Sequence, residues 1–280
     1  MIRSPSYSQV ERARASSWKR STRTIPTGAR EAAQYVGKGG EPGGKPYDFC
    51  LPADHADANL LPEVREAALV LFSDLGIPWH AGIGCGPGNH LLSSQVQCVN
   101  ALGQMVSDAD RLRRAFTDLL GTVEVLQIEP GRFLTFEYIG ATDHLNEAPG
   151  GERVRGAHCT SFDAAFLHRT EDKLVELVLL EWKYTESYRP RTPEATKDAI
   201  RWKRYGALFE SPDGRVRSDV LDFVDLLDEP FYQLMRQQLL AHELEKEHAH
   251  GGPRPRRARG TGGQHRLPEV VASADASCAR

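Results

Sequence analysis

The chain is poor in cysteine, lacks any long apolar run and carries almost no excess charge, and each shortage excludes a class of protein. Its five cysteines are spread over 280 residues without a CxxC pair, which fits a reducing cytosol better than a disulfide framework. No stretch approaches the roughly 20 apolar residues that a membrane span needs, and no apolar signal core follows the N-terminal charges. We therefore expect a cytoplasmic protein without a membrane partner. Because the net charge is only −3, any nucleic-acid surface must be local.

Two segments contain residues of the kinds that bind ligands, but their spacing fits no standard site. Cys85 and Cys98 lie near His80 and His90; their spacing matches no zinc finger, so free thiols are the favoured interpretation and a zinc site is the alternative. The glycine-rich stretch at 82–89 is followed by no GK[ST] sequence, so it does not indicate a phosphate-binding loop. We interpret it as a loop that leads into a helix.

The first part of the chain is rich in Ser, Arg and Gly. Residues 1–40 contain eight Lys or Arg against two acidic residues, Glu11 and Glu31. We expect residues 1–46 to form a disordered basic arm. A nucleic-acid-binding arm is one interpretation, and a solvated tail or a wrongly assigned start codon is the favoured one. The folded domain is expected over residues 47–248, followed by a disordered tail at 249–280.

The apolar pattern changes its period along the folded region. Spacing of three and four residues predicts helices, and spacing of two predicts strands. Helices are expected at about 61–75, 91–103 and 107–120, strands at 122–128, 132–140, 160–169 and 174–186, and further helices at 194–209 and 231–248. This order of helices, strands and helices is typical of an α/β domain with a central mixed sheet. We find no internal repeat.

Three charged residues fall on the two most apolar strands. With a turn at Thr170–Lys173, the last two strands form a hairpin that places Asp163 beside Glu181, and Lys183 lies two residues further on. Side chains two apart in a strand point to the same side. Converging carboxylates repel unless a cation lies between them, and such oxygen ligands suit Mg²⁺ or Mn²⁺. A neighbouring lysine can stabilise a phosphate transition state.

An Asp, a hairpin and then Glu-x-Lys at the end of an apolar strand resemble the PD-(D/E)XK nuclease superfamily. Its core is a helix, a three-stranded meander, a second helix and a last strand. NHLLSSQVQCVN, EWKYTESY and FYQLMRQQLLAHELEK extend the resemblance to a group of bacterial restriction endonucleases, over about Asn59 to His248. The resemblance implies a restriction-endonuclease-like α/β fold, here with additional N-terminal helices.

The resemblance also assigns roles to individual residues. It implies that Asp163 and Glu181 bind the metal, together with the backbone carbonyl of Trp182, and that Lys183 is the catalytic lysine. Helices that flank the sheet often contribute a further side chain; the matching residues here are Gln95, Gln233 and Gln237. We also consider as supporting residues, nearby in sequence, Glu137, Glu147 and His158. Each of these alone is more often a solvated strand end or a helix-surface amide, so the placement on adjacent strands carries the assignment.

The segment after the lysine strand is basic and has Trp202 and Tyr205 interleaved. Six cations within sixteen positions can follow a phosphate backbone, and a solvated helix face is the competing interpretation. The candidate DNA-contacting residues are Arg189, Arg191, Lys197, Arg201, Lys203 and Arg204.

The leading hypothesis is a Mg²⁺- or Mn²⁺-dependent endodeoxyribonuclease of bacterial defence, with DNA as substrate and, as in many restriction enzymes, a homodimer. One alternative is a catalytically weak nuclease-fold module that binds nucleic acid in a defence or repair system. Another is a metal-free α/β domain in which Glu181 and Lys183 form only an ion pair.

The segment after the last helix does not read as a strand. Residues 251–271 (GGPRPRRARGTGGQHRLPEVV) are too poor in apolar residues for a buried strand, so the closing strand of the core is expected to be missing. Codons chosen to encode 251–260 read ADRVRVVHV when their first base is dropped. We therefore hypothesise that a frameshift near Gly251 replaced the last strand, and sequencing of the gene tests this.

Overall fold

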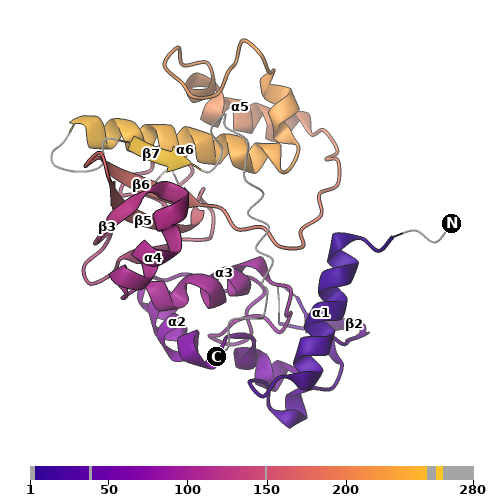
Figure 1. The fold of residues 1–280 in the computed structure, drawn as a ribbon. Helices are drawn as coiled ribbons and strands as arrows, with labels where there is room; N and C mark the ends of the chain where they lie inside the picture. Colours follow the sequence, from indigo (N-terminus) through magenta and orange to yellow (C-terminus); the bar gives the residue numbers. More distant parts are fainter. Residues whose placement is uncertain (1–3, 38–39, 149, 251–256, 261–280) are drawn as a thin grey trace.

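A central β-sheet lies between two layers of helices, and a smaller N-terminal unit packs beside it (Figure 1). The computed structural model describes residues 4–37, 40–148, 150–250 and 257–260. Within this part of the chain, no helix combines the length and apolar character that crossing a membrane requires. The predicted α/β architecture is confirmed.

The N-terminal unit is ordered, so the expectation of a disordered arm over residues 1–46 is wrong for the part that the structure describes. Its core consists of Ile25, Ala29, Leu51 and Ala58. The buried Lys19 donates to the carbonyls of Glu31 and Cys50. Composition does not reveal such polar anchors, which explains the error. The elements are α1 (Tyr7–Ser21), η1 (Thr27–Ala29), β1 (Ala33–Val36), β2 (Pro42–Tyr47) and η2 (Ala53–Asn59).

Between residues 62 and 250 the α-helices and strands follow the order that the apolar spacing predicts. Asp108 caps one of the helices, since its side chain accepts from the N–H of Arg111 at 2.9 Å. The helices are α2 (Pro62–Asp74), α3 (Ser94–Leu102), η3 (Gly103–Met105), α4 (Ala109–Leu120), α5 (Ala195–Phe209), η4 (Phe223–Leu227) and α6 (Phe231–His250). The strands are β3 (Thr122–Leu126), β4 (Leu134–Tyr138), β5 (Phe162–Thr170), β6 (Val175–Leu180) and β7 (Arg257–Gly260).

The sheet has the order β3-β5-β6-β7, and β4 also pairs with β5. β3 and β4 pair with successive halves of the long strand β5, since Leu126 faces Leu167 and Leu134 faces Phe166. The first strand of the meander is therefore interrupted by the loop at 127–133. These pairings and the β5–β6 pairing are antiparallel, whereas β7 runs parallel to β6.

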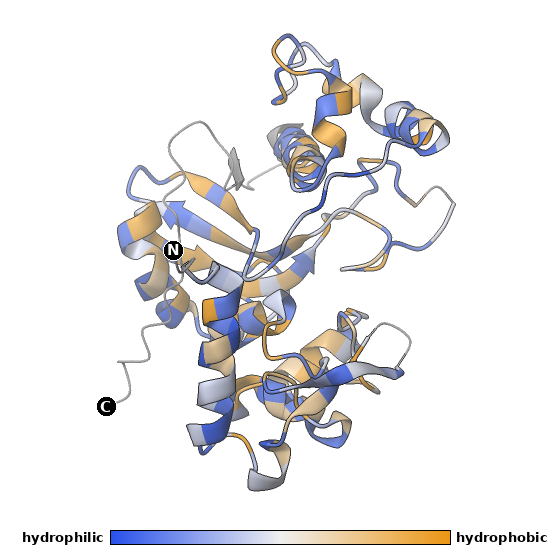
Figure 2. Ribbon diagram, turned by 90° about the vertical axis from the view of Figure 1, so that its right-hand side faces the viewer, coloured by the Kyte–Doolittle hydropathy of each residue, from blue (hydrophilic) through white to orange (hydrophobic). Residues whose placement is uncertain are grey.

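Both faces of the sheet are covered, as the apolar run in β6 indicates. Val178 packs with α2 and α3 on one face, and Leu177 and Leu179 pack with α5 and α6 on the other. Figure 2 shows hydrophobic segments along the central strands. Because both faces are buried, the register of β5 and β6 is fixed, and so are the positions of the charged residues at the end of this hairpin.

The expected absence of the closing strand is a second correction. Residues Arg257–Gly260 form β7 in the reading frame as it stands, and Leu177 pairs with Ala258 in its register. The prediction assumed that the closing strand must be buried and therefore apolar. β7 is instead an edge strand that pairs through its backbone groups, and charged residues are common in edge strands. The frameshift hypothesis thereby loses the observation that motivated it. The rest of the predicted tail, 251–256 and 261–280, lies outside the described residues.

Candidate active site

Asp163 and Glu181 occupy neighbouring positions at one end of the β5–β6 hairpin. Ala164 pairs with Leu180, so the next position along the two strands joins Asp163 to Glu181. This is the register that the turn at residues 170–173 predicts. The Asp163 carboxylate accepts the backbone N–H of Trp182 at 2.6 Å, which fastens the start of β5 to the segment leaving β6.

Glu181 is held by one ammonium and two amides. Its Oε1 lies 2.6 Å from Nζ of Lys183 and accepts from Nε2 of Gln233 at 2.7 Å. Its Oε2 accepts from Nε2 of Gln237. Gln233 also accepts from Lys183 at 2.8 Å, so its amide bridges both charges. The two glutamines lie one turn apart on α6, and the structure brings both to the carboxylate, as the resemblance implied.

A third carboxylate, Glu137, lies at the same end of the sheet on β4. Because Tyr138 pairs with Phe162, Glu137 falls beside Asp163 in the strand register. Its backbone has a φ of +48°, a costly conformation for a side chain of this size. The buried carboxylate accepts from Gln95 at 3.2 Å and from Ser161 at 2.7 Å.

Glu137 therefore joins the site more closely than the sequence indicated, where it was only a supporting candidate. An acidic residue inside the apolar run FLTFEYI was the available signal. Gln95 reaches the site through Glu137, and it also accepts the N–H of His80 at 2.8 Å, which fixes its side chain. His158 lies exposed in the loop before β5.

The electrostatics of the cluster favour a bound cation. Burial first, and then the neighbouring charge of Glu181, raise the pKa of Asp163 well above its ordinary range. Burial also raises the pKa of Glu137, and Glu181 adds to the increase. Burial alone would lower the pKa of Lys183, but Glu181 outweighs it and the net pKa is raised. The ammonium of Lys183 contacts Glu181 and lies near Asp163, and it stays charged at neutral pH.

The donor set fits Mg²⁺ or Mn²⁺, which bind through one or two carboxylates, waters and substrate phosphate oxygens. Asp163 and Glu181 offer carboxylate oxygens side by side. Among the described residues no group of three or more His, Cys, Asp and Glu is placed so that it could hold a metal ion. A site for Mg²⁺ would therefore have only two of these carboxylates as ligands, with waters and substrate oxygens completing the shell.

The indole of Trp182 fixes the backbone between the two charged residues of the motif. Its Nε1 donates to Gln97 of α3 at 2.9 Å, and its ring packs against the core on that face. The N–H of Trp182 binds Asp163. The N–H and the side chain of Trp182, the residue whose carbonyl is a metal ligand in the resemblance, are thus both held in place.

The basic segment 189–204 is only partly free to bind DNA. Arg191 and Arg201 both pair with Asp198 at 2.8 and 3.0 Å, and Lys197 pairs with Glu194. The guanidinium of Arg201 also lies over the ring of Tyr232. These pairs satisfy much of the charge locally. The remaining candidates are two exposed residues and one that lies over Tyr205, namely Arg189, Lys203 and Arg204.

Glu147 forms a buried network behind the site. Its carboxylate accepts from the hydroxyl of Tyr205 at 2.6 Å and from both the N–H and the hydroxyl of Thr160. Arg236 of α6 lies 3.7 Å away and donates to Thr160. The network ties the loop before β5 to α5 and α6. It therefore supports the position of Ser161, which bonds Glu137.

Replacing Glu147 with Ala is expected to lower the free energy of unfolding by about 1–3 kcal/mol, because it leaves the hydroxyl of the buried Tyr205 and the N–H of Thr160 without their acceptor. Urea denaturation followed by circular dichroism measures the effect. Glu171→Ala, at the exposed turn of the hairpin, is the matched control and should change stability by less than about 0.5 kcal/mol. Equal stability of the two variants would contradict a structural role for the network.

Replacing Gln233 with Leu is expected to lower DNA cleavage about 10–100-fold, the usual cost of removing a partner that orients a metal ligand. The substitution removes the amide that joins Glu181 to Lys183. Initial cleavage rates over a range of Mg²⁺ concentrations measure it, and the required concentration should rise. Gln238→Leu, on the same helix, is the control and should leave both quantities unchanged.

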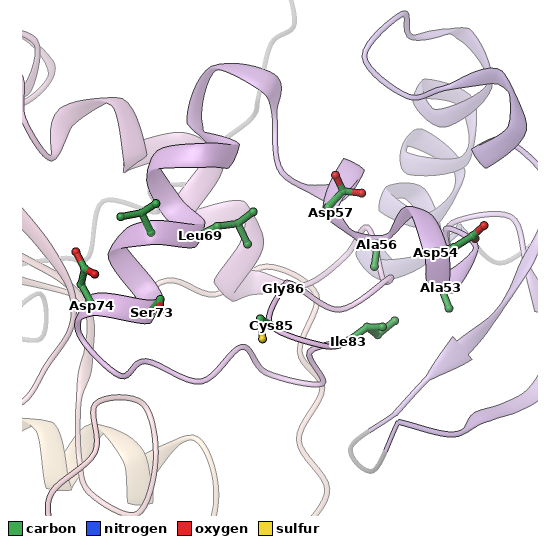
Figure 3. A pocket seen from close by; sticks show the side chains of 11 residues that line it. Ala53, Asp54, Ala56, Asp57, Leu69, Ser73, Asp74, Ile83, Cys85 and Gly86 are labelled. Atoms are coloured by element: carbon green, nitrogen blue, oxygen red, sulfur yellow. The ribbon is translucent and has the colours of Figure 1, made fainter.

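A separate pocket of about 640 Å³ lies between η2, α2 and the loop at 83–86. Figure 3 shows Asp74 at one end and Asp54 and Asp57 at the other, with Leu69 between them. Its carboxylates do not converge, and none of the site residues lines it. The geometry gives this pocket no part in the carboxylate cluster.

Comparison with known families and proteins gives one match. The model of a family described as "Restriction Endonuclease associating with ARP" matches residues 12–256. This range includes most of α1, the whole sheet except β7, and all of the residues that surround Glu181. No curated protein and no solved structure matches the chain.

Proposed function

Because this chain belongs to the family of restriction endonucleases associating with ARP, we propose that it hydrolyses phosphodiester bonds of DNA at the Asp163–Glu181–Lys183 cluster. The observation that carries the proposal is that the register of β5 and β6 brings two carboxylates side by side, and that a charged lysine contacts one of them. Asp163 and Glu181, with the Trp182 carbonyl, would hold Mg²⁺ or Mn²⁺. We further propose that Glu137 supports this site from the neighbouring strand.

The residues divide the chemistry among them. A bound divalent cation supplies Lewis-acid activation of the phosphate and lowers the pKa of a coordinated water. Lys183 donates to a phosphate oxygen where negative charge increases in the transition state. Since its pKa is raised, it acts as a charged donor and not as a base. Gln233 and Gln237 orient Glu181, and Trp182 aligns Asp163 with it.

Relaxation of supercoiled plasmid DNA tests the proposal. Purified protein is incubated with Mg²⁺, with Mn²⁺, with Ca²⁺ and with EDTA, and nicked and linear products are separated on agarose. We expect cleavage with Mg²⁺ or Mn²⁺ and none with EDTA. Salt-sensitive DNA binding without cleavage would overturn the catalytic proposal in favour of a binding module. Neither binding nor cleavage would leave Glu181 and Lys183 as a structural ion pair.

A further inference from the structure

Helix α1 has its polar and aromatic residues on unexpected sides. Its buried residues are Glu11, Ser16 and Lys19, all polar. The aromatic residues Tyr7 and Trp18 are exposed, by 50% and 37%. A surface helix normally turns its apolar side chains inward. Figure 2 shows α1 coloured mainly blue and white. The aromatic rings of Tyr7 and Trp18 are therefore accessible at the surface of the helix.

The orientation of α1 is fixed by its own contacts. Lys19 is fully buried, and its ammonium donates to the carbonyls of Glu31 at 2.6 Å and Cys50 at 2.5 Å. Rotating the helix to bury Trp18 would break both bonds and strand a buried charge. At its N-terminus Ser6 and Gln9 form a capping box. The exposed aromatic face is therefore a property of the folded chain.

The same helix reaches the candidate active site. The hydroxyl of Tyr184, the residue after Lys183, donates to Glu11 at 2.9 Å. Tyr7 and Arg14 are close enough to influence the pKa of Tyr184, which burial and Glu11 raise. Figure 1 shows α1 and α5 on different sides of the segment that leaves β6. The hydrogen bond from Tyr184 thus holds α1 against the segment that follows the catalytic lysine.

The chemistry of this face suits nucleic acid. Tyr7, Glu11, Arg14 and Trp18 are spaced four, three and four residues apart, which places them on one side of a helix. Glu11 is the buried member of this stripe and pairs with Arg14. The side chain of Arg14 is 64% exposed and has only Glu11, at 3.0 Å, as an ion-pair partner among the described residues. Residues 4–37 contain six Lys or Arg and two acidic residues, whereas the whole chain has a net charge of −3. Arginine binds phosphates, and aromatic rings stack on bases or sugars.

We propose that the Tyr7–Arg14–Trp18 face of α1 binds the DNA strand next to the scissile phosphate, and this rests on the proposed nuclease function. Arg14 contacts a backbone phosphate in exchange for its partner Glu11. Trp18 and Tyr7 stack on the nucleotides that follow. The hydrogen bond between Glu11 and Tyr184 keeps this face aligned with Lys183.

Fluorescence anisotropy with a labelled DNA duplex that carries a single-stranded overhang tests the inference. The binding measurements use the Asp163→Asn protein in EDTA, so that cleavage does not interfere. Trp18→Ala should weaken binding about 5- to 100-fold, the range for one stacked base. Arg14→Gln should weaken binding and lower the slope of log K against log salt by about 0.7–0.9, one phosphate contact.

Arg114→Gln on α4 is the matched control. Its side chain is 59% exposed and pairs with Asp110 one turn away, much as Arg14 pairs with Glu11. Circular dichroism melting confirms that all three variants are folded. Affinity and salt slope equal to the control in both α1 variants would overturn the inference. If the wild-type protein still cleaves plasmid, the nuclease proposal survives that result; if it neither binds nor cleaves DNA, both fail.

Discussion

Replacing Lys183 with Met is expected to lower kcat for DNA cleavage about 10²–10³-fold, while the affinity for DNA changes little. Removal of one charged or hydrogen-bonding donor at a developing anion has about this cost. The ammonium of Lys183 lies 2.6 Å from Glu181 and 2.8 Å from Gln233, and its side chain is 42% exposed. It is thus held in one place by α6 and the strand end, yet it is accessible to a phosphate.

Two comparisons distinguish the charge of Lys183 from its shape. Lys183→Arg keeps the charge but replaces a compact ammonium by a planar fork, so partial activity is expected. Lys45→Met removes an exposed lysine that is distant from Lys183 in the sequence, and it should leave kcat unchanged. Because Glu181 keeps the pKa of Lys183 above its usual value, no loss of rate between pH 6 and about 9 should arise from this group. A Met variant that retains most activity would exclude the role.

The sequence predicts the hairpin because local and long-range preferences agree there. The polar turn at Thr170–Lys173 and the apolar runs on either side allow one register, in which both faces are buried. A slip of one residue would move Asp163 and Glu181 to the wrong faces. The observed pairing of Ala164 with Leu180 follows from those constraints. The helix glutamines were found only through the resemblance, since Gln233 and Gln237 look like any amphipathic helix.

Other features depend on contacts that have no periodic pattern. Glu137 enters the site through a positive φ, a conformation that strand patterns do not signal. Helix α1 is fixed by the polar anchor Lys19 and not by an apolar face, so its composition resembles a disordered arm. β7 pairs through its backbone at a sheet edge, where Arg257 and Arg259 are compatible with a strand. In each case tertiary contacts outweigh local composition.

Replacing Asp163 with Asn is expected to lower the rate of DNA cleavage about 10³-fold. The amide is neutral and binds Mg²⁺ far less well than a carboxylate, and loss of several kcal/mol of metal-assisted stabilisation corresponds to this factor. The Asn oxygen still accepts the N–H of Trp182, so the hairpin end keeps its geometry. Plasmid cleavage over a range of Mn²⁺ concentrations measures the loss. Asp172→Asn, at the exposed turn, is the control and should cleave as the wild type does.

The same variant is expected to be more stable than the wild-type protein when no metal is present. Burial and the charge of Glu181 raise the pKa of Asp163 in the folded state. The folded protein therefore binds more protons than the unfolded chain, whose Asp pKa is about 3.9, and its stability falls as pH rises from there through the folded pKa. Asp163→Asn removes this cost, which is roughly 1.4 kcal/mol for every tenfold difference between the acid constants of the folded and unfolded states.

Thermal melting in EDTA at pH 4 and pH 8 measures this effect. At pH 8 the Asn variant should melt about 2–4 °C higher for each kcal/mol recovered, and at pH 4 the two proteins should melt nearly together. Mg²⁺ should raise the melting temperature of the wild type at pH 8, because a ligand that binds only the folded state stabilises it, and should not raise that of the Asn variant. A variant that melts lower than the wild type at pH 8 would show that the charged Asp163 stabilises the hairpin. This outcome would contradict the prediction that its carboxylate is destabilising when no cation is bound.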